Sequence, residues 1–483
     1  MNRLLHLLVV MAWVGVPCCT KAEVIQCVPH YAKVGASCSA TGAVTAAAWT
    51  IRSNVLVADH LYVGGVVRWN AAGRIDQVGC ADVQTGERVL DCPGEVVAPG
   101  FINLHEHLNF GADKPLPPPL HRLSSHRDWQ NDPGLWGGKS APWTLSRQLI
   151  GLVELRHLLS GTTTIAGRAQ TKGLTRNPDV GWFAPVANIT FPFGKHALAP
   201  PDNCRDRRIL SGKKPTLVHA GEGVDDEARA ELACLLDNRE AFGQTESLTL
   251  VHAVAVDQAL AARMVALKVS MVWSPRSNMF LYDATAPIDI LLRAGVSISL
   301  GTDWLLSGSP TLLDEARYAQ SLSLTEKVLS DDRSLSAADE SLSDDLLMDM
   351  MTTHPAAAIG MRGQLGELKV GAYADMVGYK LHDIEYAKRN ILSSYSRDVS
   401  FVLVGGKLKF VGESASVALD RFVPQLDCAA IPDTQCAPHG YACGAHFLKH
   451  ALKRSDAAEV LCPAANAANA NFQFGEARLR SSP

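Results

Sequence analysis

A repeating order of helix, glycine and strand runs through the middle of the chain and restricts the folds open to it. Apolar residues recur at helical spacing from Leu145 to Leu159, Gly161 follows in the place of a left-handed helix cap, and Thr162 to Ala166 form a compact strand. The same order returns between Ile288 and Leu300. Strands that alternate with helices in this way form parallel βα units with right-handed crossovers, which leaves a closed barrel or a doubly wound sheet.

Polar residues close several of the expected strands. These strand ends carry His105 and His107, then His219 with Glu222 three residues later, then His252, then Asp303. In a barrel the functional side chains sit at the carboxyl ends of the strands, so this recurrence is typical of an active-site rim. Residues two apart on a strand point the same way, so His105 and His107 can reach one metal ion. Alone, each residue is explained as a structural histidine or a helix cap, but the order H-x-H, H-x-x-E, H, D indicates a site.

The donor set predicts hydrolytic chemistry. A divalent ion held by three neutral imidazoles and one carboxylate keeps a net positive charge, which lowers the pKa of a bound water from about 15.7 toward about 7. Zinc is favoured by histidine ligation, and iron or manganese would accept the same ligands. We therefore expect one divalent metal ion and attack by water on an sp² carbon of a ring amidine or an amide.

The sequence resembles the metal-dependent amidohydrolase superfamily, and within it the branch of cytosine deaminase, guanine deaminase and the triazine chlorohydrolases. Besides the strand-end residues, the resemblance is carried by Gly161-Thr162-Thr163-Thr164, Ser274-Pro275-Arg276-Ser277-Asn278, Gly295 to Asp303, and Gly366 to Asp375. It covers about Thr50 to Ser414. It implies an α/β fold with a (β/α)8 barrel over residues 99–363, inserted between the two halves, 50–98 and 364–414, of a small β-sandwich domain.

The resemblance also assigns roles. The metal ligands fall on His105, His107, His219 and Asp303, and the catalytic residues on Glu222, His252 and Asp303. Glu222 would give a proton to the ring nitrogen, His252 would steady the water or the developing oxyanion, and Asp303 would pass a proton to the leaving amine.

Family members with two metals bridge them through a carboxylated lysine after an intermediate strand. Here the strand Thr162 to Ala166 leads to Gly167 and Arg168, with no lysine at its end, which predicts one metal. Lys172 and Lys195, both in expected loops, are the nearest candidates for the opposite interpretation.

The substrate is less constrained than the reaction. Trp304 and Trp273 are placed to stack on a planar ring, while Arg276, Arg168 and Asn109 are placed to hydrogen-bond the ring or a carboxylate. Each of these residues has an equally good architectural role. The proline- and tryptophan-containing stretch from Asn109 to Trp143 is expected to be an ordered insertion over the pocket.

Residues 1–22 are typical of a cleaved signal peptide. A basic residue precedes the apolar run Leu4 to Val16, which is shorter than the roughly 20 residues of a spanning helix, and Thr20 to Ala22 offer a small-residue cleavage site. A retained anchoring helix is the alternative. Lipidation of the cysteines after Pro17 is disfavoured, because proline is a poor residue just before a lipidated cysteine. The predicted location is secreted or periplasmic.

The cysteines agree with export. Of 12 cysteines, the ten beyond the signal are Cys27, Cys38, Cys80, Cys92, Cys204, Cys234, Cys428, Cys436, Cys443 and Cys462. An even set in an oxidising compartment predicts disulfides, and the spacing lacks the close pairs of a structural zinc site. A buried free thiol stays open for Cys234. The cysteines concentrate in the N-terminal segment 23–49 and a C-terminal extension, 415–483, whose expected role is a stapled cap or a partner-binding module.

Three functions follow. The first is deamination or related hydrolysis at a ring carbon, the second is hydrolysis of an acyclic or cyclic amide such as an acyl-amino acid or lactam, and the third is a non-catalytic surface protein with a relic barrel. The net charge of −4 gives no electrostatic reason to expect nucleic acid or an anionic membrane. The expected partner is a small-molecule substrate, without a stable membrane span, and self-association into a homo-oligomer is left open.

Overall fold

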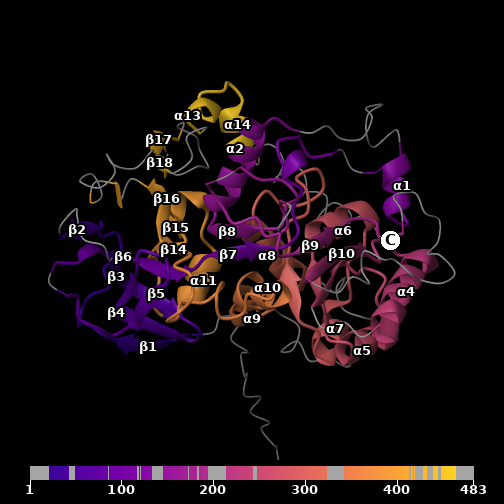
Figure 1. Cartoon of the computed structure of the whole chain (residues 1–483), viewed down its shortest axis with the longest axis horizontal. Coiled ribbons are helices and arrows are strands. Elements are labelled where there is room, and N and C mark those ends of the chain that lie inside the picture. Colours follow the sequence, from indigo (N-terminus) through magenta and orange to yellow (C-terminus); the bar gives the residue numbers. More distant parts are fainter. Residues whose placement is uncertain are drawn as a thin grey trace, which may run out of the picture.

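A computed structural model describes most of the chain (Figure 1). The described residues are 21–42, 49–84, 86–116, 119, 121–132, 145–171, 173–181, 184–193, 214–242, 247–323, 342–412, 415–416, 418, 428–431, 439–443 and 448–463. Residues 1–20 of the predicted signal peptide lie outside this described part, as do Trp136, Trp143, Lys172, Lys195, Cys204, Cys436 and the end of the C-terminal extension. Within the described part, no helix combines the length and the apolar character needed to cross a membrane.

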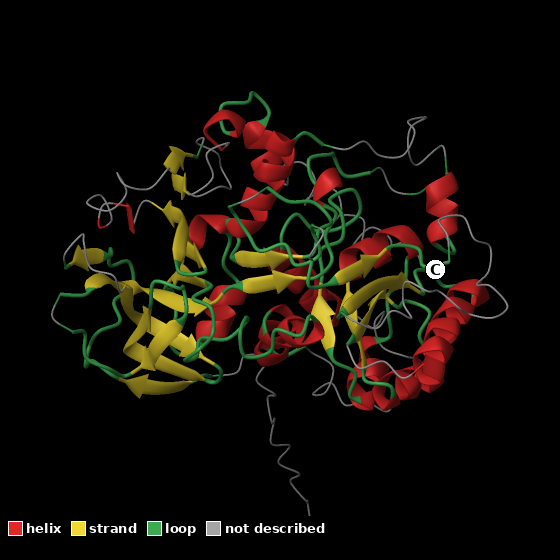
Figure 2. Ribbon diagram, viewed as in Figure 1, coloured by secondary structure: helices red, strands yellow, loops and turns green. Residues whose placement is uncertain are grey.

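One large sheet collects strands from both ends of the sequence. Its strands are β1 (Glu23–Gln26), β2 (Ser39–Thr41), β3 (Trp49–Val57), β4 (His60–Trp69), β5 (Ile75–Gly79), β6 (Arg88–Pro99), β14 (Met376–Lys380), β15 (Val399–Val404), β16 (Lys407–Gly412), β17 (Cys428–Ala430) and β18 (Gly440–Cys443). The two halves meet where β6 pairs antiparallel with β14. The sheet has 11 strands in the main order β1-β4-β3-β6-β14-β15-β16-β18-β17, with β2 on β6 and β5 on β4. It lies to one side of the molecule in Figure 2.

The middle of the chain forms parallel βα units, as the sequence predicts. Its strands are β7 (Phe101–Asn103), β8 (Thr162–Ile165), β9 (Ala187–Ile189), β10 (Thr216–Ala220), β11 (Leu248–His252), β12 (Val269–Trp273) and β13 (Ile298–Leu300). They fall into a parallel pair, β7-β8, and a five-stranded parallel sheet in the order β13-β12-β11-β10-β9. The α/β class with parallel sheets is thus confirmed, although these hydrogen bonds do not close the two sheets into one ring.

Helices cover and connect these strands. They are α1 (His126–Asn131), α2 (Arg147–Leu158), α4 (Asp226–Phe242), α5 (Gln258–Ala266), α6 (Pro275–Tyr282), α7 (Ile288–Ala294), α8 (Leu312–Ser323), α9 (Asp344–Met351), α10 (Thr353–Ala358), α11 (Ala387–Leu392), α13 (Leu448–Ala451) and α14 (Ala457–Leu461), with short 3-10 turns η1 (Leu108–Phe110) and η2 (Ser396–Asp398). The helix and glycine expected before β8 are α2 and Gly161, whose φ is +98°. A left-handed residue of this kind ends a helix without steric cost when it is glycine.

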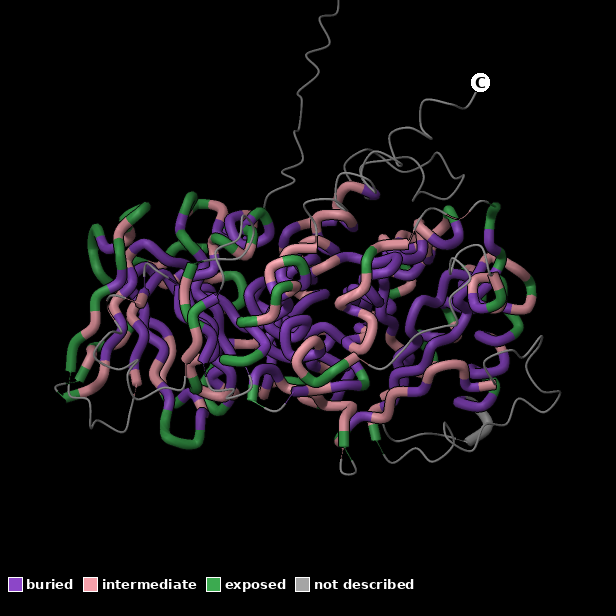
Figure 3. The backbone as a smooth tube through the Cα atoms, turned by 90° about the horizontal axis from the view of Figure 1, so that it is seen from above, coloured by how far each residue is buried: buried purple, intermediate pink, exposed green. Residues whose placement is uncertain are grey.

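The strands alternate between two apolar clusters. Leu217, Val251 and Val272 share one buried cluster inside the arc of parallel strands, and Val218 and Leu250 belong to a second cluster that also contains helical residues. Because successive side chains of a strand point to opposite faces, this split tells which strand residues face inward. Figure 3 shows the buried interior running through the barrel-like half and the large sheet alike.

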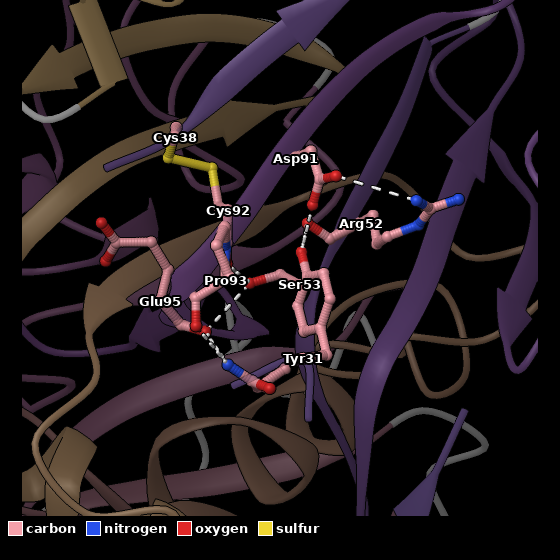
Figure 4. The surroundings of a disulfide bond; sticks show 9 residues. Tyr31, Cys38, Arg52, Ser53, Asp91, Cys92, Pro93 and Glu95 are labelled. Atoms are coloured by element: carbon pink, nitrogen blue, oxygen red, sulfur yellow. Dashed lines mark hydrogen bonds and ion pairs between the residues drawn. A yellow bond between two sulfur atoms is a disulfide. The ribbon is translucent and has the colours of Figure 1, made fainter. Parts of the chain in front are cut away.

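The predicted disulfides are present. Bonds join Cys27 to Cys80, Cys38 to Cys92 and Cys428 to Cys443, and Cys234 and Cys462 are also disulfide-bonded. The free-thiol alternative for Cys234 is therefore wrong. Figure 4 shows the Cys38–Cys92 disulfide; Cys92 lies within β6, next to Asp91, which accepts a hydrogen bond from the Tyr31 hydroxyl. The bridge ties the N-terminal segment to the sheet that carries the C-terminal strands.

Candidate metal centre and active site

The H-x-H pair lies just past the end of β7 rather than on the strand itself. β7 ends at Asn103, and the following segment stays extended because it continues beside the end of β13. The backbone N–H of Asp303 donates to the carbonyl of His105 at 2.8 Å, and Glu106 and Asp303 form a parallel bridge. This pairing brings the first two predicted ligands and the fourth to the same place, although Asp303 follows His105 by nearly two hundred positions.

His219 and His252 reach the same place by different routes. His219 stands on β10 two residues after Leu217, so the alternation of the strand points it inward. His252 follows the inward-facing Val251, so the same alternation would turn it away from the site. Its φ of +73° breaks the alternation. Asp303 has a φ of +57°, and such strained non-glycine residues cluster at functional sites.

Four predicted ligand side chains converge on one point. The Nε2 atoms of His105, His107 and His219 lie 3.1 to 3.4 Å from one another. Asp303 Oδ1 lies 3.2 Å from the Nε2 of His105 and 3.4 Å from that of His107. Ligands about 2.0–2.1 Å from a tetrahedral zinc ion would stand about 3.3 Å apart, so the spacing fits such an ion. Among the described residues, two groups of three could hold a metal ion: His105 with His219 and His252, and His105 with His107 and Asp303.

The charge states also match the donor set. Burial lowers the pKa of His105 and His219, and it lowers the pKa of His107 to about 4. Burial alone would raise the pKa of Asp303, but the neighbouring imidazoles, His105 foremost, hold the pKa of its carboxyl well below the usual range. Imidazoles that release their protons readily and a carboxyl group that ionises readily are the donors that a divalent cation binds.

The start of α6 orients the site. Ser274 Oγ lies 2.8 Å from His105 Nδ1, and Asn278 Oδ1 lies 3.0 Å from His252 Nδ1. Ser277 Oγ donates to Asp303 Oδ2 at 2.6 Å. These hydrogen bonds orient the two imidazole rings and the carboxylate through atoms other than the converging Nε2 and Oδ1 atoms. The motif Ser274 to Asn278 can be recognised in the sequence, but the partner of each of its side chains cannot. Those partners depend on α6 beginning directly after β12.

Glu222 is held by two donors. The Tyr282 hydroxyl donates to Glu222 Oε1 at 2.8 Å and the Trp129 indole N–H donates to the same oxygen at 3.3 Å. The other oxygen, Oε2, lies 3.6 Å from His252 Nε2. Burial raises the pKa of Glu222, against the opposing influence of His252 and these two donors. A carboxyl group with a raised pKa stays protonated at higher pH than an ordinary carboxyl group, as a general acid requires.

A cavity of about 440 Å³ opens onto these groups. Its walls are His107, Asn109, Phe110, Trp129, Gln130, Gly167, Arg168, Thr190, Phe191, His219, Glu222, His252, Asp303 and Trp304. Three of the five predicted substrate residues, Asn109, Arg168 and Trp304, are among them. Arg276 is not: its guanidinium lies 4.3 Å from the Tyr318 ring centre, and its Nε donates to Ser309 at 2.7 Å. An arginine at a strand end can either stabilise a loop or bind substrate. Arg276 stabilises the loop that contains Ser309.

Aromatic side chains form one wall of the cavity. The ring centres of Trp129 and Trp304 lie 5.1 Å apart, those of Phe110 and Trp304 5.7 Å, and those of Trp129 and Phe191 6.3 Å. Trp129 comes from α1, so the described part of the expected insertion does reach the pocket. Trp273, the other predicted stacking residue, is instead buried and donates to Thr285.

Comparisons with known proteins agree with this geometry. Residues 213–409 match the Amidohydrolase family. A 5-methylthioadenosine/S-adenosylhomocysteine deaminase of Syntrophomonas wolfei subsp. wolfei is 26% identical over 387 residues, which cover 69% of this chain and 86% of that protein. The enzyme of the same name from Carboxydothermus hydrogenoformans is 27% identical over 393 residues, covering 69% and 86%.

Solved structures share the fold. An adenosine deaminase from Xanthomonas campestris with bound zinc superposes with a TM-score of 0.57 at 18% identity, covering 78% of this chain and 97% of that one. A triazine hydrolase variant gives a TM-score of 0.58 at 20% identity, covering 79% and 98%.

The fold, the site and these comparisons together define a hydrolase of the α/β class with a candidate metal centre. The resemblance to the metal-dependent amidohydrolases is confirmed, and so is the predicted class of enzyme, a hydrolase that acts on carbon–nitrogen bonds other than peptide bonds.

Proposed function

We propose that this protein is a deaminase, which hydrolyses the exocyclic C–N bond of an aromatic amidine such as an aminated nitrogen heterocycle. The observation that carries the proposal is the position of Glu222, buried on the cavity wall beside the converging ligands, with a raised pKa. Such a group can give a proton to the basic ring nitrogen of an amidine, whereas the nitrogen of an amide or lactam has no comparably basic lone pair. The deaminase names of the relatives support the same reaction.

The proposed ligands are His105, His107, His219 and Asp303, around a single divalent ion, with zinc the best match to three imidazoles. When bound, the ion lowers the pKa of a coordinated water so that hydroxide is available near neutral pH. The strand β8 ends at Ile165, followed by Gly167 and Arg168, so no lysine stands at the position where a second ion would be bridged.

The three catalytic residues transfer protons or orient the attacking water. Since Oε1 of Glu222 accepts from Tyr282 and Trp129, its proton resides on Oε2, the oxygen nearer His252. Glu222 gives that proton to the ring nitrogen as the neighbouring carbon is attacked. His252, fixed by Asn278, hydrogen-bonds the water oxygen as it adds to the carbon. The ionised Asp303 takes the remaining proton of that added oxygen and passes it to the amine, which leaves as ammonia.

The cavity favours a flat ring. Trp129, Phe191, Phe110 and Trp304 present aromatic faces or edges to it, and stacking on such surfaces suits a planar heterocycle. Arg168 favours a second candidate, hydrolysis of an acyl-amino acid or lactam, because its exposed guanidinium at the cavity could bind a carboxylate.

A substrate panel and one substitution test the proposal. Zinc-loaded protein should release ammonia from one of a set of aminated heterocycles and leave acylated amino acids intact. Glu222→Gln should abolish turnover while the bound metal, measured by inductively coupled plasma mass spectrometry, stays at the wild-type amount. Turnover of acylated amino acids alone would favour the second candidate, and loss of the metal in Glu222→Gln would refute the division between ligands and proton donor.

We also propose that the two parallel sheets are arcs of one (β/α)8 barrel over 99–363, and that the large sheet belongs to a β-sandwich domain of segments 50–98 and 364–414. The parallel bridge between Glu106, just after β7, and Asp303, just after β13, links one end of each arc and supports the first part. The disulfides support export, because such bonds persist in oxidising compartments. Peptide mapping of the secreted protein without reduction would test export and cysteine pairing together.

A further inference from the structure

The C-terminal extension, which lies beyond the matched family region, packs against the barrel half of the molecule. β18 extends the large sheet by pairing with β16, and α13 and α14 lie on α2 (Figure 1). Leu448, Val460 and Leu461 of the extension share one buried apolar cluster with Leu152 and Val153 of α2. Cys462, directly after α14, is disulfide-bonded. The extension is thus attached to α2 by packing, and the disulfides at Cys428–Cys443 and at Cys462 stabilise the extension.

Arg156 connects this attachment to the active site. Its guanidinium is buried and donates to three backbone carbonyls: Nη1 to Gly111 at 2.7 Å and to Val460 at 3.0 Å, and Nε to Pro310 at 3.0 Å. Val460 belongs to the extension. Gly111 and Pro310 belong to two different loops, one after His107 and one after Asp303. A single planar side chain therefore joins three segments that are far apart in sequence.

Both loops line the cavity. The first contains η1, whose Asn109 and Phe110 form part of the wall, and the second contains Trp304. Phe110 and Trp304 touch with ring centres 5.7 Å apart, so displacement of either loop moves the shared wall. Gly111 also packs so close to α2 that a Cβ atom there would stand 2.4 Å from Val153 Cγ1. The support under the first loop is therefore tight and specific.

We infer that Arg156 is a positioning residue for the reaction and that the disulfide-held C-terminal extension is part of the support of the active site. The inference rests on the proposed function only for its effect on turnover; the effect on loop order is independent of it. Burial lowers the pKa of Arg156 to about 10, so the side chain is still charged at neutral pH. Lysine cannot replace it, because an ammonium group lacks the planar fork that reaches three carbonyls.

The test compares Arg156→Lys and Cys462→Ser with two matched controls in the full chain. Arg239→Lys alters another buried arginine that donates to a carbonyl, that of Leu267, away from the cavity. Cys80→Ser removes a disulfide in the N-terminal segment. Amide hydrogen exchange over residues 108–111 and 304–310, measured without substrate, should become faster in both test variants and stay at the wild-type rate in both controls. Bound metal should stay unchanged.

For the active enzyme, kcat/KM of Arg156→Lys should fall by about tenfold to a hundredfold, the usual cost of a small misplacement at a catalytic site. Wild-type exchange in both pocket loops of both test variants would overturn the inference. If Arg156→Lys does not fold, amide hydrogen exchange of the two pocket loops in Cys462→Ser alone tests the inference. Because the exchange needs no substrate, loss of the proposed deaminase activity on every compound tested would refute the proposed function and leave this result standing.

Discussion

The hydroxyl of Tyr282 provides a measurable control over the proposed acid catalyst. Tyr282→Phe removes the 2.8 Å hydrogen bond to Glu222 Oε1. It also removes the hydroxyl oxygen that accepts from the Trp129 indole N–H at 2.9 Å, so the 3.3 Å bond from Trp129 to Glu222 is the one that remains to that N–H. A donor stabilises the ionised carboxylate more than the neutral acid, so its loss raises the pKa of Glu222 further. The Tyr282 side chain is fully buried, and its own pKa is raised well above 10 by burial, so it is a donor throughout the working range.

The size of the effect follows from the bond. A hydrogen bond to a charged group contributes about 1.5–3 kcal/mol. At 1.36 kcal/mol for each pKa unit, the pKa of Glu222 should rise by about 1 to 2 units. If protonated Glu222 is the active form, kcat/KM declines as that proton is lost. The alkaline limb of the pH profile should therefore move upward by the same amount in Tyr282→Phe.

Steady-state kinetics across the pH range, on any substrate found in the panel, give the assay. Tyr379→Phe is the matched control, because Tyr379 is equally buried but donates to the carbonyl of Ser160, at 3.1 Å, under α2. That variant should lose stability without moving the limb. An alkaline limb that stays in place in Tyr282→Phe, or that moves equally in both variants, would show that Glu222 does not carry the proton that limits the rate.

Three further predictions concern the metal, a buried acid and a disulfide. Removing metal with dipicolinate should lower Tm by several degrees, since a ligand at a thousand times its Kd contributes about 4 kcal/mol, and added zinc should restore it; equal calorimetric traces would argue against a resident ion. Burial raises the pKa of Glu315 to about 7 from 4.5, so the folded state holds an extra proton between these values and the free energy of unfolding should fall as pH rises through that window. Urea denaturation at pH 5 and pH 8 should show wild type losing about 3 kcal/mol more than Glu315→Gln, and equal losses would contradict the shift. Replacing Cys428 and Cys443, 15 residues apart, with serine should cost about 3 kcal/mol in the same assay, and no change in the midpoint would refute a stabilising bridge.

The sequence predicts those site residues whose position follows from strand topology. His219 is placed by simple alternation along β10, and Asp303 by the end of β13, so both can be found without coordinates. For His252 the sequence predicts the right strand end, but alternation along the strand would place its side chain on the outer face. The left-handed backbone conformation of His252 turns the ring inward. Patterns of apolar residues carry no information on such local strain.

Contacts between distant loops are harder to predict. Trp129 and Tyr282 both donate to Glu222, yet neither lies near it in sequence, and both look like ordinary apolar packing residues. Arg276 is predicted to hydrogen-bond the substrate because it is an arginine near a strand end, but its guanidinium lies over the Tyr318 ring and not in the cavity. The C-terminal extension follows no family pattern, so its pairing with β16 and its contact with Arg156 could not be foreseen.

The energetics of the centre argue for a cation on their own. His219 Nδ1 is buried with no hydrogen-bond partner in the described structure, while its Nε2 faces two other imidazole nitrogens at 3.1 and 3.4 Å. Burial keeps these rings neutral, so each offers one lone pair and the close contacts lack enough protons to be satisfied as hydrogen bonds. Unsatisfied buried polar groups cost about 1–3 kcal/mol each. The serine and asparagine side chains of α6 nevertheless hold His105 and His252 in this arrangement, which is stable only if something positively charged accepts the lone pairs and offsets the ionised Asp303.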